Sequence, residues 1–100
     1  MSRNEVLLSG RVTHLEPLRY TPAGIPLLSF SLLHQSQQLE AKHERTVNLD
    51  LPVLVLGELA REMAAITQDQ PLLVKGFLAR RSVKSASVVL HATAYKTDLE

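Results

Sequence analysis

Residues 46–78 read TVNLDLPVLVLGELAREMAAITQDQPLLVKGFL and contain two different apolar spacings. The first six residues alternate polar and apolar side chains, a period of two that predicts a β-strand. We expect this strand to end near Pro52, because proline has no N–H to donate to a strand ladder. Behind Gly57 the period lengthens to that of a helix, with apolar residues at Leu59, Met63 and Ile66. The stretch therefore predicts a strand, a short helix over residues 57–66, and a further strand from Leu72 onward.

The two-residue period recurs along the rest of the chain and predicts five strands in all. They cover residues 6–12, 28–33, 46–51, 72–78 and 88–94. Gly10 and Gly76 lie inside two of them, as at the bends and close approaches of a sheet that closes on itself. Five strands with a helix between the third and fourth describe an all-β fold, the five-stranded oligonucleotide-binding (OB) barrel. A small β-sandwich is the structural alternative, and in either case we expect residues 1–100 to form a single domain.

Charge is sorted along the chain although the net charge is only +1. Residues 71–97 contain five cations and no carboxylate, whereas residues 40–69 contain six acids and three cations. A basic stretch is what a polyanion-binding surface requires, and a solvated surface is the more common explanation of any single charge cluster.

Composition excludes several classes of protein. A hydrophobic content of 45% with 21% charged residues is that of an ordinary globular protein. The chain has no apolar run near the 20 residues that span a bilayer and no secretory signal, so we expect no membrane association. It has no cysteine, which agrees with a reducing compartment, and we expect a cytoplasmic protein.

Catalytic signatures are missing from the sequence. The four glycines are too far apart to form a phosphate-binding loop, and no serine lies in a nucleophile elbow. The four histidines never pair at metal-ligand spacing, so we expect them at the surface or in barrel packing. We predict no enzyme activity, no catalytic residue, no cofactor and no metal; a small hydrolase using His34 or His91 is the explanation with least support.

Candidate binding residues lie in the expected connections between strands, which are residues 16–24, a polar loop over 35–44 and a basic loop over 80–86. Arg80, Arg81 and Lys84 lie at the expected tip of the last hairpin, where cations can reach phosphates or can simply keep an edge soluble. Tyr20 beside Arg19 is the best candidate for base stacking, although it can also pack beneath its turn. Phe30 alternates with serines and should face the core.

Several short motifs together resemble the PriB family, primosomal replication protein N. In chain order they are Leu8-Ser9-Gly10, Pro17-Leu18-Arg19, Thr21-Pro22-Ala23-Gly24-Ile25-Pro26, Phe30 before Leu33-His34, Leu51-Pro52-Val53, Gly76-Phe77-Leu78 and Val89-Leu90-His91-Ala92. The resemblance covers nearly the whole chain. It implies a homodimer of OB folds that binds single-stranded DNA and acts in replication restart with the PriA helicase and DnaT.

The resemblance also carries binding residues onto this sequence. It places the first-loop cation at Arg19, the cation leading into the third strand at Arg45, and the cationic last loop at Arg80, Arg81 and Lys84. Two family features are absent. Asn48 stands where some members have an aromatic residue on the third strand, and acidic Asp50 lies two residues further on. Gln35 stands where an arginine can follow the histidine that ends the second strand. We therefore expect the loops, more than the strand face, to hold DNA.

The expected function is that of an accessory protein of the replication-restart primosome. It would bind single-stranded DNA through loop cations and stimulate a partner helicase. A general single-strand binder such as SSB is a second interpretation of the same class. The alternative from a different class is a protein-interaction scaffold with weak or vestigial nucleic-acid binding.

Overall fold

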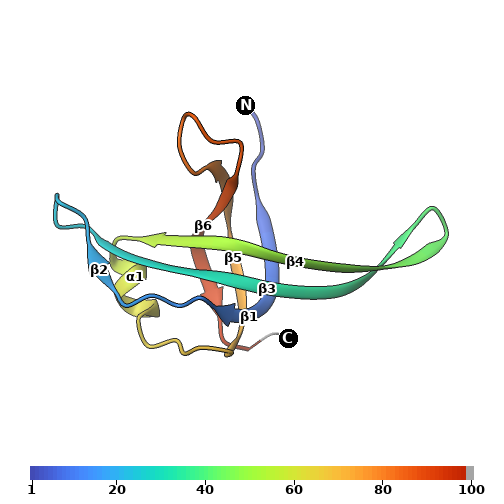
Figure 1. The fold of residues 1–100 in the computed structure, drawn as a ribbon, viewed down its shortest axis with the longest axis horizontal. Helices are drawn as coiled ribbons and strands as arrows, with labels where there is room; N and C mark the ends of the chain where they lie inside the picture. The colour runs from blue at the N-terminus through green and yellow to red at the C-terminus, as the bar shows by residue number, and fades with distance from the viewer. Residues whose placement is uncertain (99–100) are drawn as a thin grey trace.

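The computed structural model describes residues 1–98, so the last two residues of the domain expected over residues 1–100 lie outside the described part. Its elements are β1 (Val6–Thr13), β2 (Arg19–Tyr20), β3 (Pro26–Glu40), β4 (His43–Leu56), α1 (Glu58–Met63), β5 (Pro71–Arg80) and β6 (Val88–Lys96). The strands lie side by side in the order β1-β5-β6-β4-β3, and β1 also pairs with β3 (Figure 1). This second pairing closes the sheet, which confirms the five-stranded OB barrel with β2 added to the start of β3.

The barrel interior is filled by the inward members of the alternating patterns. Its fully buried side chains come from every barrel strand and from the helix: Val12, Leu28, Leu32, Val53, Val55, Met63, Leu72, Val74 and Leu90. Phe30 is also buried, as its alternation with serines predicts. Because inward and outward residues alternate along a strand, the serines beside Phe30 lie on the outer surface of the barrel.

The helix packs against the barrel as its spacing predicts, although it is shorter than expected. It covers Glu58–Met63 instead of residues 57–66, and it lies against β3 and β4. Met63 is fully buried, and Ile66 is buried just beyond the helix end. No helix in residues 1–98 is long and apolar enough to cross a membrane.

Two sequence-based expectations fail where β3 and β4 extend beyond the barrel. The polar loop expected over residues 35–44 is wrong, because the two strands pair without interruption from Leu27 with Leu56 to Glu40 with His43. The strand end expected near Pro52 is also wrong. Pro52 pairs with Ser31 on β3. On the other edge of β4 the pairing with β6 is at Val53 and Leu54, so no ladder bond at Pro52 requires an N–H donor on that edge.

The extension of β3 and β4 forms a two-stranded arm, residues 34–49, which projects from the barrel in Figure 1 and contributes to a longest dimension of 50 Å. A two-residue turn closes it, with φ of 51° at Ala41 and 68° at Lys42. Positive φ at both central residues is the type I′ geometry that suits a hairpin. Such turns usually contain asparagine and glycine, so alanine and lysine at these positions do not indicate a turn in the sequence.

Candidate nucleic-acid interface

A groove crosses the outside of the barrel over β3, β4 and β6. Its volume is about 430 Å³, within the range of about 300–1,000 Å³ that is usual for ligand sites. We call it the barrel groove. It is lined by His14, Glu16, Ser29, Phe30, Ser31, Pro52, Val53, Leu54, Arg80, Arg81, Val89 and His91.

The two walls of the barrel groove differ in charge. On one side Arg80 ends β5 and Arg81 begins the β5–β6 loop, and both side chains are exposed. The opposite side comes from the connection between β1 and β2, where Glu16 accepts a hydrogen bond of 3.0 Å from the Ser29 hydroxyl. A phosphate backbone would therefore lie along the side of the groove formed by the two arginines, because the Glu16 carboxylate on the opposite side repels phosphate.

Lys84 lies in the same β5–β6 loop as Arg81, with its side chain exposed. The loop is tied at its base by the hydrogen bond from the Arg81 N–H to the Ser87 carbonyl, at 3.0 Å. It rises beside the N-terminal segment in Figure 1, apart from the arm. Of the three cations expected in the last loop, Arg81 and Lys84 lie in the loop itself, and Arg80 is the last residue of β5.

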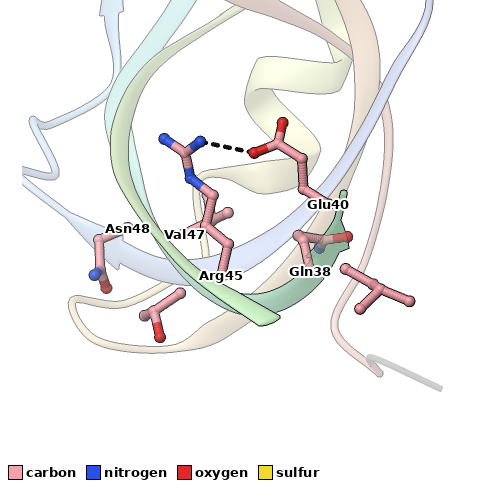
Figure 2. A pocket seen from close by; sticks show the side chains of 7 residues that line it. Gln38, Glu40, Arg45, Val47 and Asn48 are labelled. Carbon is pink, nitrogen blue, oxygen red and sulfur yellow. Dashed lines mark hydrogen bonds and ion pairs between the residues drawn. The ribbon is translucent and has the colours of Figure 1, made fainter. Parts of the chain in front are cut away.

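Arg45 lies on the arm, where its guanidinium is 2.9 Å from the Glu40 carboxylate (Figure 2). Both side chains are 67% exposed, so solvent screens the ion pair and it contributes little to stability. Strand alternation places Arg45 on the same face as Val47 and Leu51, which is the face that continues into the barrel core. Asn48 lies on the opposite face, so Arg45 and the outer strand surface form separate sites.

Arg19 and Tyr20 form the short strand β2, which pairs with Leu27 and Pro26 at the start of β3. Tyr20 is 53% exposed, so its turn does not cover it. The guanidinium of Arg61 from α1 lies 5.6 Å from the centre of the Tyr20 ring. This cation–π contact occupies one ring face and leaves the side chain about half accessible.

The sequence-predicted residues therefore lie in three places. Arg80, Arg81 and Lys84 lie at the barrel groove and its loop, Arg19 and Tyr20 at β2, and Arg45 on the arm. Sequence reasoning did not assign His14, Glu16 or His91 to a binding site. For His91 the signal was available, because it alternates with the inward residues Leu90 and Ala92 and must therefore face outward.

His34 has a structural position at the base of the arm. Its Nδ1 lies 2.6 Å from the Ser9 carbonyl, which can only accept, so Nδ1 carries the proton. Its Nε2 then accepts from the Ser36 hydroxyl at 2.8 Å, and Ser36 in turn accepts from Gln38 at 3.0 Å. Within the described part of the chain, no three His, Cys, Asp or Glu side chains gather as a metal site would require.

Comparison with known proteins agrees with this architecture. Residues 4–94 match a family described as "Another single-strand binding protein family". The replication restart protein PriB of Bordetella pertussis is 40% identical over 88 residues, which are 88% of this chain and 82% of that protein. This chain belongs to the PriB family.

Solved structures extend the comparison. A PriB structure from Ralstonia solanacearum superposes with a TM-score of 0.85 at 29% identity, and the match covers 95% of this chain and 97% of the other. The single-stranded DNA binding protein from Thermus aquaticus gives a TM-score of 0.77 at 29% identity, covering 94% of this chain and 49% of that one. The PriB family resemblance seen in the sequence motifs is thereby confirmed.

Proposed function

We propose that this chain binds single-stranded DNA in the barrel groove and serves in replication restart. The observation that carries the proposal is the position of Arg80 and Arg81 along one side of a groove that crosses β3, β4 and β6. OB barrels bind oligonucleotides on this strand face and on the flanking loops. The description of the matching family and the name of the single-stranded DNA binding protein from Thermus aquaticus support this class of ligand, and the name of the PriB relatives supports the role in replication restart.

Phosphate contacts supply most of the affinity in this proposal. Arg80 and Arg81 line one side of the barrel groove, and Lys84 is exposed in the loop that follows them. The part of the groove formed by β3 and β4 has short or aliphatic side chains such as Ser29, Ser31 and Leu54. Binding through cations releases counterions, so the affinity falls linearly with salt on a logarithmic scale, and it reads no base sequence.

The test is a fluorescence-anisotropy titration of labelled single-stranded and double-stranded DNA at several salt concentrations. Replacing Arg80, Arg81 and Lys84 together with alanine should weaken binding to every sequence. The salt slope should fall by up to about two units, because each phosphate that the protein neutralises adds about 0.7 to it. Exchanging the same three residues for Lys, Lys and Arg keeps their charge and should keep the slope. Unchanged affinity and slope in the alanine variant would show that this loop is only a solvated edge.

Partners beyond DNA follow from the family resemblance. The chain would act as a homodimer, hold single-stranded DNA near the PriA helicase, and stimulate that enzyme while passing the strand toward DnaT. Catalysis would belong to the helicase. A purified helicase titrated with this chain, with and without single-stranded DNA, measures the stimulation directly, and an unchanged helicase rate would remove this part of the proposal.

A second candidate function is favoured by the outer face of β3 and β4. Its cross-strand pairs are Leu27 with Leu56, Ser29 with Leu54, Ser31 with Pro52, and Leu33 with Asp50. Leu33 is 47% exposed and Leu56 45% exposed, and this set contains neither a cation nor an aromatic residue. Such a surface suits a protein better than a phosphate backbone. A scaffold would bind the helicase with an affinity independent of DNA, and Leu56→Lys would abolish that binding.

A further inference from the structure

We propose that the imidazole ring of His91, supported by Phe77, stacks on one nucleobase of the strand held in the barrel groove. This inference rests on the proposed function and adds a base-contacting position to a site otherwise made of cations. The starting observation is a parallel pair of rings: the centroids of Phe77 and His91 are 5.0 Å apart and their planes differ by 3°.

The sheet order determines which face of His91 is available. Phe77 on β5 and His91 on β6 are direct cross-strand partners, and on its other side His91 pairs with Leu54 of β4. Phe77 therefore covers the ring face toward β5. The other face lies toward Leu54 of β4, and His91 is one of the residues that line the groove.

Phe77 gives the imidazole a fixed orientation. The imidazole is already held in one orientation by the phenyl ring, so it loses less rotational freedom when a base binds. The entropic cost of ordering this side chain on binding is therefore smaller. Phe77 itself is 40% exposed and is not among the groove-lining residues. We therefore assign base contact to His91 and a positioning role to Phe77.

The surroundings supply the rest of a nucleotide site. Arg80 and Arg81 line the same groove as His91, so a phosphate and its base can be held together. The aliphatic side chain of Leu54 and the ring of Pro52 form an apolar floor next to the imidazole. Stacking accepts any base because every base has a π face, so this position adds affinity without adding sequence preference.

The test separates the contribution of the bases from that of the backbone. The probes are a labelled thymidine oligonucleotide and an abasic strand of the same length and charge, each titrated against the whole chain by fluorescence anisotropy. His91→Ala should weaken binding of the thymidine strand about fivefold or more and leave the abasic strand unaffected. His91→Phe keeps a flat ring and should restore the affinity. The salt slope should not change in either variant.

Several outcomes would overturn the inference. His91→Ala that binds the thymidine strand as tightly as the unaltered chain would remove the stacking role, and so would an equal reduction in affinity for both strands. His43→Ala is the matched control and should bind both strands as the unaltered chain does, since His43 is exposed on the arm and is not among the groove-lining residues. If the unaltered chain binds neither strand, the proposed function itself is wrong. Melting temperatures of the variants confirm that each one folds.

Discussion

Gly76 shows how closely the strands of this barrel approach one another. A Cβ atom at this position would overlap the backbone carbonyl of His91, and at Gly10 it would lie 2.5 Å from the carbonyl oxygen of Leu33. Both neighbours are backbone atoms, which cannot move aside as a flexible side chain can. The register between β5 and β6 also shifts between Lys75 and Gly76, so the bend that closes the sheet depends on a residue without a side chain.

We expect Gly76→Ala to destabilise the fold by about 3 kcal/mol, because the added methyl group forces two strands apart. Gly24→Ala is the control: its φ is 82°, but the space around its missing Cβ is open. That change should cost only about 1 kcal/mol of backbone strain. Thermal unfolding followed by circular dichroism should show a much larger destabilisation for Gly76→Ala, and equal melting temperatures would contradict the steric argument.

For single residues the sequence predicted burial better than binding. The buried positions of Phe30 and Met63 followed from alternation and helical spacing. The position of Arg45 did not, because its face depends on the register of an arm whose turn, Ala41-Lys42, has no recognisable signal. The binding roles of Arg19, Tyr20, Arg45, Arg80, Arg81 and Lys84 remain predictions.

Among the elements, α1 could be predicted from the sequence, whereas most of the arm could not. The change of period behind Gly57 indicates the helix, since Leu59, Met63 and Ile66 form one apolar face. Over residues 35–44 the arm has mostly polar residues on both faces, so no alternation separates this part from a loop. The arm is defined by the pairing of β3 with β4, and this pairing depends on contacts between two strands, which the residue pattern of one strand does not show.

The helix should be essential to the stability of the barrel. Met63→Asp would bury a carboxylate among apolar neighbours, because Met63 is completely buried, and we expect the free energy of unfolding to fall by about 4 kcal/mol or more. Glu62→Gln is the matched change one residue earlier on the exposed side, expected within about 0.5 kcal/mol of the unaltered chain. Urea unfolding gives both free energies. Similar midpoints for the two variants would mean that α1 does not contribute to the core.

For the whole molecule, several strand edges within residues 1–98 lie outside the ladders that close the barrel, and the first half of β1 is one of them. β1 pairs with β5 over Val6–Arg11, but it pairs with β3 only over Arg11–Thr13. Within residues 1–98, the edge from Val6 to Leu8 that faces away from β5 therefore has no strand partner, whereas the Ser9 carbonyl accepts a hydrogen bond from His34 of β3. An unpaired edge is a template for another chain, and two copies of one strand can pair antiparallel about a twofold axis.

An apolar patch next to this edge favours a second copy as the partner. Leu7 on β1 is 66% exposed and lines a mainly apolar surface depression on the outside of β1, β5 and β6. The other residues that line it are Leu73, Lys75, Ala94, Tyr95 and Lys96. This surface is separate from the residues of the barrel groove, so a dimer through β1 leaves both grooves open to DNA. Two grooves on one dimer would also offer a strand a longer track than one 100-residue chain can.

We therefore expect light scattering at micromolar concentration to give about twice the chain mass of 11.1 kDa. Leu7→Asp places a charge on each copy at the centre of the expected contact, and it should shift the mass to that of one chain while the exposed position keeps the fold intact. Leu39→Asp is the matched control, because Leu39 is 76% exposed at the tip of the arm and should leave the dimer unchanged. A dimer that survives Leu7→Asp would place the interface elsewhere, and a single-chain mass for the unaltered protein would exclude the homodimer.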